Sequence, residues 1–290
     1  MTRCGIVALA GRPNAGKSTL LNALVGQDLA IISPKPQTTR EPVRGLLTEG
    51  DTQILFVDPA GLLDPGYPLQ SAMVHQAREV IHDADLVLHV HDASEGPAPP
   101  LAALDPGLRV PEEKILTVYT KADLDSGGRG GATGARAFVV SAVRKTGLEP
   151  LLAAIRERLP EGPFLYDAGD VGTQPLRFFA AEFIREAAYG ILEQELPYAL
   201  AVVIEEFREN ATPVYIRATL AVERESQKPI VLGKGGRTIK AIGTAARKRL
   251  ESFLDRRVHL ELWVTVWPKW RKDAAALARI GLPLPPERAR

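Results

Sequence analysis

The sequence predicts two domains: an α/β domain with a doubly wound, mostly parallel sheet, and a smaller α+β domain after it. Three observations support this prediction. The 290 residues exceed the roughly 100 to 200 residues of a usual compact domain. Short apolar runs alternate with helical segments in the first part of the chain, which is typical of a parallel sheet with helical crossovers. Beyond residue 160 this alternation ends.

The predicted strands of the first domain are short and rich in Val, Ile and Leu, as expected of strands that a sheet buries on both faces. They cover residues 6–10, 53–57, 86–91, 115–119 and 137–140, and the predicted helices cover 18–25, 70–83 and 149–159. Ligands of doubly wound sheets bind at the carboxyl ends of the strands. A functional site is therefore expected in the loops that follow these strands.

A change of composition near residue 160 predicts the end of the first domain. Residues 161–175 are rich in Pro, Gly and Asp, which favours a linker. The predicted organisation is a first domain at 1–160, a linker at 161–175, a second domain at 176–282 and a tail at 283–290. The second domain should run helix (176–195), strand (199–207), strand (214–223), glycine-rich turn, helix (239–254) and strand (258–266). Another glycine-rich stretch, 127–134, predicts a flexible loop.

Composition excludes several classes of protein. With 45% hydrophobic and 24% charged residues, the chain has the composition of a globular protein, not of a disordered, collagenous or coiled-coil one. Every apolar run is shorter than the roughly 18 to 20 residues of a transmembrane helix, and the N-terminus lacks a signal-peptide pattern. The single cysteine, Cys4, excludes an internal disulfide. These features predict a cytoplasmic protein.

The charge is unevenly distributed along the chain. Residues 228–290 contain 15 Lys or Arg and 5 Asp or Glu, a net +10, whereas residues 1–227 contain 21 and 30, a net −9. A basic end on an acidic body indicates a polyanionic partner such as nucleic acid. An ordinary solvated surface is the alternative.

A phosphate-binding loop follows the first predicted strand. Residues 11–18 read Gly-Arg-Pro-Asn-Ala-Gly-Lys-Ser and match the pattern G-x-x-x-x-G-K-[ST]. Backbone N–H groups of such a loop point at a phosphate near the start of a helix, whose partial positive charge favours an anion. Lys17 would contact the β- and γ-phosphates, and the Ser18 hydroxyl would bind Mg²⁺. The motif predicts a nucleotide site with Mg²⁺.

Three later motifs, each after its own strand, indicate which nucleotide binds. They are Asp58-Pro59-Ala60-Gly61, Thr120-Lys121-Ala122-Asp123 and Ser141-Ala142. An aspartate such as Asp58 can hold Mg²⁺, and the N–H of Gly61 can meet a γ-phosphate. Asp123 can accept two hydrogen bonds from guanine, whereas adenine has no such pair of donors. Each motif alone would indicate only a solvated loop, but their order favours a guanine nucleotide.

With these motifs, the chain resembles the Ras-like GTPases of the translation-factor class and, among them, the bacterial Era family. The resemblance covers nearly the whole chain and implies a P-loop GTPase domain that uses GTP, GDP and Mg²⁺. It implies that residues 37–40 form the effector loop, that Lys17, Thr39 and Gly61 act in catalysis, and that Ser18, Thr39 and Asp58 bind the metal. The nucleotide-binding residues that it implies are Gly11, Asn14, Ala15, Gly16, Lys17, Ser18, Thr19, Asp58, Gly61, Thr120, Lys121, Asp123, Ser141 and Ala142.

Three positions affect the expected affinity for guanine and the expected rate of hydrolysis. Thr120 stands where the family usually has an Asn, whose amide would tie the base to the P-loop, so guanine affinity is an open question. Leu62 stands where Ras has the glutamine that orients the attacking water, which predicts slow intrinsic hydrolysis. Arg40 is expected to be a solvated side chain of a mobile loop, with a role in stabilising charge during hydrolysis as the alternative.

A second glycine motif, G-x-x-G at 233–236, lies between an apolar run and a predicted helix. The order helix, strand, strand, helix, helix, strand around it resembles a type II KH domain, whose G-x-x-G loop clamps about four nucleotides. Nearby Lys and Arg would add affinity through counterion release. The predicted RNA-binding residues are Gly233, Lys234, Gly235, Gly236, Arg237 and Lys240. The alternative is a charged amphipathic helix that covers a sheet.

The resemblance implies a GTP-hydrolysing switch that binds the 3′ region of 16S ribosomal RNA and acts in assembly of the 30S subunit. The alternative is an RNA-binding scaffold whose nucleotide is structural. A P-loop kinase is disfavoured because the base motifs would have no purpose. Family members can associate peripherally with the inner membrane, and a basic face suits anionic lipid as well as RNA. The sequence indicates no protein partner.

Overall fold

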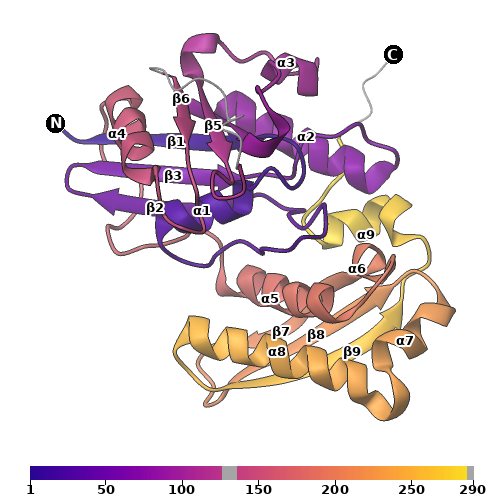
Figure 1. Ribbon diagram of the computed structural model, residues 1–290. Coiled ribbons are helices and arrows are strands. Elements are labelled where there is room, and N and C mark those ends of the chain that lie inside the picture. Colours follow the sequence, from indigo (N-terminus) through magenta and orange to yellow (C-terminus); the bar gives the residue numbers. More distant parts are fainter. Residues whose placement is uncertain (126–135, 286–290) are drawn as a thin grey trace. The chain divides into compact units, whose positions relative to one another are not determined.

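The computed structural model describes residues 1–125 and 136–285 (Figure 1). The chain forms two compact units: unit 1 comprises Met1–Gly66 and Met73–Thr173, and unit 2 comprises Tyr67–Ala72 and Gln174–Arg290. The glycine-rich stretch 127–134 and positions 286–290 of the expected tail lie outside the described residues. None of the helices within the described ranges is long and apolar enough to cross a membrane.

Unit 1 is built on a six-stranded sheet with the order β2-β3-β1-β4-β5-β6. The strands are β1 (Arg3–Ala10), β2 (Val43–Glu49), β3 (Thr52–Asp58), β4 (Leu86–Asp92), β5 (Ile115–Thr120) and β6 (Ala137–Val139). All neighbours are parallel except β2 and β3, which pair antiparallel. The register places Asp92 at the end of β4 beside Thr120 at the end of β5. The loops after the parallel strands therefore leave from one edge of the sheet, where ligands of such sheets bind.

Helices cover both faces of this sheet. They are α1 (Lys17–Val25), α2 (Pro68–Asp83), α3 (Leu101–Leu104) and α4 (Leu148–Arg158), with 3₁₀ turns η1 (Ala93–Glu95) and η2 (Glu112–Lys114). Helix α1 packs on one face, where a Cβ at Gly45 of β2 would lie 2.7 Å from Val25. On the other face, Ala77 and Ile81 of α2 share a core with Val87 of β4. The predicted doubly wound α/β fold is confirmed.

Strand β2 was not predicted from the sequence. Its segment, Val43–Glu49, is interrupted by an exposed arginine and by Gly45, so that it lacks both the unbroken apolarity of a central strand and a clean alternation. It still forms a strand because it folds back beside β3 (Figure 1). The two strands pair antiparallel, with Leu46 opposite Leu55.

Residues 161–173, which were expected to be a linker, are bound to unit 1. The side chain of Gln53, fully buried on β3, accepts hydrogen bonds from the N–H groups of Leu165 (2.8 Å) and Tyr166 (3.1 Å) and donates one to the Tyr166 carbonyl (2.9 Å). Farther along, the Leu46 N–H of β2 donates to the Val171 carbonyl at 3.0 Å. One buried amide thus satisfies several backbone groups of this segment, which lies along the sheet.

Unit 2 contains a three-stranded sheet, β7-β8-β9, in which β7 and β8 are antiparallel and β8 and β9 parallel. Its elements are α5 (Leu176–Ile191), α6 (Leu196–Ala199), β7 (Ala201–Arg208), β8 (Val214–Val222), η3 (Glu225–Gln227), α7 (Lys228–Leu232), η4 (Lys234–Gly236), α8 (Arg237–Leu254), β9 (Val258–Val266), η5 (Trp270–Lys272) and α9 (Ala274–Arg279). Figure 1 shows α5 and α8 side by side. The ring of Phe253 on α8 lies 5.1 Å from those of Phe179 and Phe183 on α5.

Three predicted boundaries in unit 2 are wrong. The helix expected at 239–254 begins two residues earlier, at Arg237. The helix expected at 176–195 ends at Ile191, because Leu192 adopts an extended backbone, with φ −82° and ψ 149°. The strand expected from residue 199 begins at Ala201, because Pro197 helps to start the short helix α6, a position where the missing proline N–H is tolerated. The order of helices and strands around the G-x-x-G loop is as expected for a KH domain.

Candidate functional site

The P-loop lies between β1 and α1 and lines a cavity of unit 1. Five of its predicted residues form part of the wall: Asn14, Gly16, Lys17, Ser18 and Thr19. Lys17 is only 6% exposed, and its Nζ donates to the Arg12 carbonyl at 3.1 Å. Because α1 begins at Lys17, the partial positive charge of the helix N-terminus lies at this cavity and favours an anion.

The loop after β3 lies directly against the P-loop. A Cβ at Gly61 would lie 2.5 Å from the backbone nitrogen of Pro13, so no residue with a side chain fits here without displacement. The next residue, Leu62, donates its N–H to the Gly11 carbonyl at 2.9 Å. Its side chain is buried in the core beside α2. Gly61 thus borders the cavity in the place expected of a group that contacts a γ-phosphate.

The three predicted metal ligands lie close together, and two of them, Ser18 and Thr39, line the cavity. The Ser18 hydroxyl donates to Asp58 Oδ2 at 2.5 Å and lies 3.0 Å from Thr39 Oγ1, which is itself 3.4 Å from Asp58 Oδ2. The other carboxylate oxygen, Asp58 Oδ1, is buried and has no hydrogen-bond partner among the described residues. Oxygen atoms of hydroxyls and carboxylates are the ligands that Mg²⁺ prefers. The residues present therefore fit a Mg²⁺ ion.

Burial shifts the pKa values of the two charged groups in this site, Lys17 and Asp58. It lowers the pKa of Lys17, against the opposing effect of the Asp58 carboxylate. Burial also raises the pKa of Asp58, against the opposing effects of the Lys17 charge and the hydrogen bonds from Ser18 and Thr39. Both groups have lost water that stabilised their charged forms. A phosphate beside Lys17 and a cation beside Asp58 would restore that stabilisation, as a Mg²⁺–nucleotide would.

The loop that carries Thr39 is folded against the P-loop. Asn14, in a left-handed backbone conformation with φ 63°, donates through its side-chain amide to the Pro34 carbonyl at 3.3 Å. Thr38 Oγ1 donates to the Lys35 carbonyl at 2.7 Å. Arg40 is only 6% exposed, so the expectation of a solvated arginine is wrong, because the loop packs onto unit 1 and buries it.

Thr120 connects the base loop, which is the Thr120-Lys121-Ala122-Asp123 motif after β5, to the P-loop. Its hydroxyl is buried and lies 2.5 Å from the Ala15 carbonyl and 3.1 Å from the His91 carbonyl. The next residue, Lys121, has a left-handed backbone with φ 57° and lines the cavity. Its Nζ pairs with Asp92 Oδ2 at 2.7 Å. The threonine therefore makes the link to the P-loop that the sequence analysis ascribed to an asparagine.

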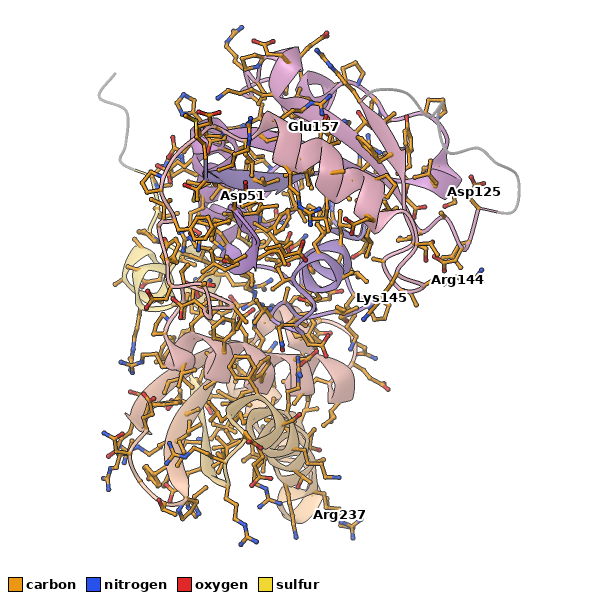
Figure 2. The ribbon with its side chains drawn as sticks, turned by 90° about the vertical axis from the view of Figure 1, so that its left-hand side faces the viewer. Asp51, Asp125, Arg144, Lys145, Glu157 and Arg237 are labelled. Atoms are coloured by element: carbon orange, nitrogen blue, oxygen red, sulfur yellow. The ribbon has the colours of Figure 1, made fainter. Side chains whose placement is uncertain are left out.

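The other base-loop residues lie at the ends of β5 and β6. The Ser141 hydroxyl donates to Asp123 Oδ1 at 2.5 Å, and this hydrogen bond is the main reason that the pKa of Asp123 lies below its usual value. Ser141 also exchanges backbone hydrogen bonds with Thr146 across the turn that contains Ala142. Figure 2 shows Arg144 and Lys145 in the same turn. A fixed, ionised carboxylate is what recognition of guanine N1–H and N2–H requires.

The G-x-x-G loop of unit 2 connects α7 to α8. Gly233 has φ 74°, and a Cβ there would lie 2.2 Å from Thr238 Oγ1, so the turn requires glycine. Lys234, Arg237 and Lys240 are exposed and have no acidic partner within ion-pair distance among the described residues. Arg237 and Lys240 line a shallow groove along α8, and Figure 2 shows the Arg237 side chain extending away from the ribbon.

Two different protein families match the two parts of the chain. A family model described as 50S ribosome-binding GTPase matches residues 6–121, and a KH-domain model matches residues 195–271. GTPase Era of Afipia carboxidovorans is 42% identical over 99% of this chain and 96% of that protein. GTPase Era of Thermotoga maritima is 41% identical over 97% of each chain. The chain belongs to the Era family of GTPases.

Solved structures of the Era family match the chain over both units. A variant of Aquifex aeolicus Era bound to GDP·AlF₄⁻ matches with a TM-score of 0.91 and 35% identity over 98% of this chain and 100% of that chain. An Era structure in complex with MgGDPNP and nucleotides 1506–1542 of 16S ribosomal RNA matches with the same TM-score, identity and coverage. The resemblance stated from the sequence motifs is thereby confirmed.

The roles of Asp92 and Gln53 were not predicted from the sequence. Asp92 belongs to no motif, and its only signal is an acidic residue at the end of a strand that already contains two histidines, His89 and His91. Gln53 looked like the unremarkable first residue of a strand, although it is fully buried. Both act through hydrogen bonds to segments that are distant in sequence, and pairing of this kind has no local sequence pattern.

Proposed function

We propose that this protein is a GTP-hydrolysing switch that binds the 3′ region of 16S ribosomal RNA and acts in assembly of the 30S ribosomal subunit. One observation carries the proposal: over 98% of its length the chain matches an Era structure that contains both MgGDPNP and nucleotides 1506–1542 of that RNA. In this proposal, residues 1–160 bind the nucleotide and residues 176–282 bind the RNA.

The phosphates of GTP would lie in the cavity beneath the P-loop. Lys17 and the backbone N–H groups of residues 14–19 would stabilise the negative charge that the transferred phosphoryl group carries. Ser18, Thr39 and Asp58 would hold Mg²⁺, which when bound would supply positive charge that stabilises the phosphates. Two observations support this assignment: the oxygen atoms converge, and Asp58 Oδ1 has no hydrogen-bond partner in the described part of the chain.

Hydrolysis would transfer the γ-phosphoryl group to water and release GDP and phosphate. The N–H of Gly61 would contact the γ-phosphate, because the loop after β3 lies against the P-loop. Leu62 has no group that can orient a water molecule, and its side chain is buried in the core beside α2. Water would have to be held by backbone groups or by a partner, so the intrinsic rate should be slow.

The guanine base would be read at the ends of β5 and β6. Asp123 would accept hydrogen bonds from N1–H and N2–H, and the Ala142 N–H would donate to O6. The alkyl stem of Lys121 would lie along the base. The Ser141–Asp123 hydrogen bond supports the assignment, because it fixes the carboxylate and favours its ionised form.

The RNA would be bound by the loop formed by Gly233, Lys234, Gly235 and Gly236, together with Arg237 and Lys240. Glycines let the phosphate backbone approach the main chain, as in other G-x-x-G loops. The cations lack acidic partners among the described residues, so they are available to replace the counterions of RNA. If Thr39 and Gly61 respond to the γ-phosphate, nucleotide and RNA affinities should be coupled in both directions.

The proposed place of action is the cytoplasm, where 30S subunits are assembled. Peripheral association with the inner membrane is a further part of the proposal, since a basic face attracts anionic lipid as well as RNA. Co-sedimentation with anionic vesicles, in the presence and absence of the RNA fragment, tests it. Binding only in the absence of RNA would indicate one shared surface, and no binding would remove the membrane from the proposal.

The test of the proposed function uses an RNA that spans nucleotides 1506–1542. Its affinity is measured with GDPNP, with GDP and without nucleotide, and phosphate release is measured under multiple turnover. We expect tight binding that depends on the nucleotide, and slow but catalytic release. Equal RNA affinity in all three states would contradict the switch. Absence of turnover would instead favour an RNA-binding scaffold with a structural nucleotide.

A further inference from the structure

Lys121 occupies a strained position at the nucleotide cavity. Its backbone is left-handed, with φ 57°, a conformation that residues with a side chain rarely adopt. It is also the member of the Thr120-Lys121-Ala122-Asp123 motif that lines the cavity. Strained residues persist only where their surroundings hold them, and they cluster at binding sites. The groups that hold Lys121 are therefore candidates for a role in nucleotide binding.

The backbone of Lys121 is held on both sides. Before it, the Thr120 hydroxyl contacts the carbonyls of Ala15 and His91. After it, the Ala122 N–H donates to the Val140 carbonyl at 3.2 Å, and the Leu124 N–H donates to Lys121's own carbonyl at 2.9 Å. These contacts fix where the side chain starts, but they do not fix where its flexible four-carbon stem goes.

The side chain of Lys121 is directed by Asp92. Lys121 Nζ lies 2.7 Å from Asp92 Oδ2. The other oxygen, Asp92 Oδ1, accepts hydrogen bonds from the Ser94 N–H at 3.0 Å and from the Ser94 hydroxyl at 2.7 Å. The side chain of Asp92 is 12% exposed and that of Lys121 is 34% exposed. One oxygen anchors the carboxylate at the end of β4, and the other receives the ammonium group.

We propose that Asp92 is a positioning residue for the base site: it draws Lys121 across the edge of the cavity, so that the alkyl stem forms a fixed wall against the base. This inference rests on the proposed function, because it takes the bound base to be guanine. A role in the turn alone would need only Oδ1, which an asparagine also provides. Only the contact with Lys121 requires the second carboxylate oxygen.

The test is Asp92→Asn. The substitution keeps an acceptor for Ser94 and removes the acceptor for Lys121. The matched control is Asp105→Asn, since Asp105 Oδ1 accepts from the Gly107 N–H at 2.9 Å and the carboxylate pairs with Arg78 at 2.7 and 2.8 Å, outside the nucleotide cavity. We expect Asp92→Asn to weaken GDP binding by about twofold to fivefold, as suits a partly exposed ion pair. The control should bind GDP like the original protein.

Two further measurements separate positioning from a structural role. Inorganic tripolyphosphate has no base, so its affinity should be unchanged by Asp92→Asn, whereas a distorted P-loop would weaken it as well. In a double-mutant cycle with Lys121→Met, the two substitutions should be non-additive, because Asp92 acts through Lys121. Ser94→Ala, which loosens Asp92 but keeps its charge, should weaken GDP binding in the same direction by less.

Several results would overturn the inference: unchanged GDP affinity in Asp92→Asn, equal losses for GDP and tripolyphosphate, or additive effects with Lys121→Met. If Asp92→Asn does not fold, unchanged GDP affinity in Ser94→Ala overturns it. Failure of the proposed function would look different. In that case the original protein itself would not prefer GDP over ADP, whatever residue stands at position 92.

Discussion

The nucleotide site and the G-x-x-G loop meet their anionic ligands in opposite ways. In the nucleotide site the charged groups are buried and already bonded: Lys17 contacts a carbonyl, and Asp58 receives the Ser18 hydroxyl. At the G-x-x-G loop, Arg237 and Lys240 are exposed and have no acidic partner among the described residues. A buried, preorganised site selects by geometry, whereas exposed cations attract any polyanion and respond to salt. Specificity for the small ligand should therefore be high and nearly independent of salt.

The largest effect expected from this contrast is at Asp58. Asp58→Asn removes the negative charge that faces Lys17 and a ligand of Mg²⁺, and breaking a buried charge pair is severe. We expect a loss of about 100-fold or more in Mg²⁺-dependent GTP affinity, with RNA affinity in the absence of nucleotide unchanged. Calorimetry with and without Mg²⁺ measures it. Asp51→Asn, at an exposed position of the same unit, is the control, and a comparable loss in that variant would show that the effect is not local.

Because burial raises the pKa of Asp58, its carboxyl group takes up a proton at a higher pH than usual. Proton and metal compete for the same oxygens, so Mg²⁺-dependent GTP affinity should fall as the pH is lowered, and the fall should begin above the ordinary aspartate range. Titrations at a series of pH values follow this loss. Affinity that is flat down to the ordinary range would contradict the burial argument.

Burial of His89 should make the stability of unit 1 depend on pH. Burial and the nearby His91 lower the pKa of His89 to about 4 from 6.5. Between pH 6.5 and pH 4 the unfolded chain therefore binds this proton more readily than the folded chain does. The free energy of unfolding that the protein has above pH 6.5 falls as the pH is lowered to 4. The loss should amount to about 3 kcal/mol. Denaturant unfolding of His89→Leu should lack this part of the pH dependence, and an unchanged slope would refute the assignment.

A smaller stability effect is expected at Gln53. Gln53→Leu keeps the size of the side chain but leaves the N–H groups of Leu165 and Tyr166 without their acceptor. Unsatisfied buried groups cost about 1 to 3 kcal/mol, and we expect a loss of about 2 kcal/mol in the stability of unit 1. Denaturant unfolding measures it, with exposed Gln27→Leu as the control. Equal stabilities would show that residues 161–173 contribute nothing to unit 1.

The smallest effect concerns the exposed cations. Replacing Arg237 and Lys240 by alanine should lower RNA affinity by about tenfold and reduce the slope of log K against log salt by about two. GTP affinity should stay the same. The control removes two exposed cations elsewhere in unit 2, Lys269 and Lys272. If the control loses as much RNA affinity, binding follows the total charge of the unit and not the G-x-x-G loop.

Most of the fold could be predicted because the relevant signals are local. The strands of unit 1 other than β2 are apolar runs between loop signals, and the P-loop motif fixes its own place between β1 and α1. Strand β2 escaped prediction because its pairing with β3 overrides a weak local pattern. Helix α5 was predicted too long because nothing in the residues after Ile191 signals the extended turn at Leu192.

In the candidate site too, residues with a local sequence signal could be predicted, and residues that depend on long-range contacts could not. The residues of contiguous motifs could be named from the sequence, since spacing alone places them together. Arg40 was misjudged because burial of a loop arginine depends on how the whole loop folds. Asp92 was missed because its partner, Lys121, lies in the loop after another strand, β5. The consequence of Thr120 could not be foreseen either, since only the structure places its hydroxyl against the Ala15 carbonyl.

The most direct test of the account is a calorimetric titration of the full chain with GTP, ATP and XTP in the presence of Mg²⁺. The account holds that a preorganised site with an ionised Asp123 selects guanine, although Thr120 replaces the usual asparagine. It predicts strong binding of GTP and much weaker binding of ATP and XTP. Equal binding of ATP and GTP would contradict the account, because it would mean that the site recognises phosphates and not the base.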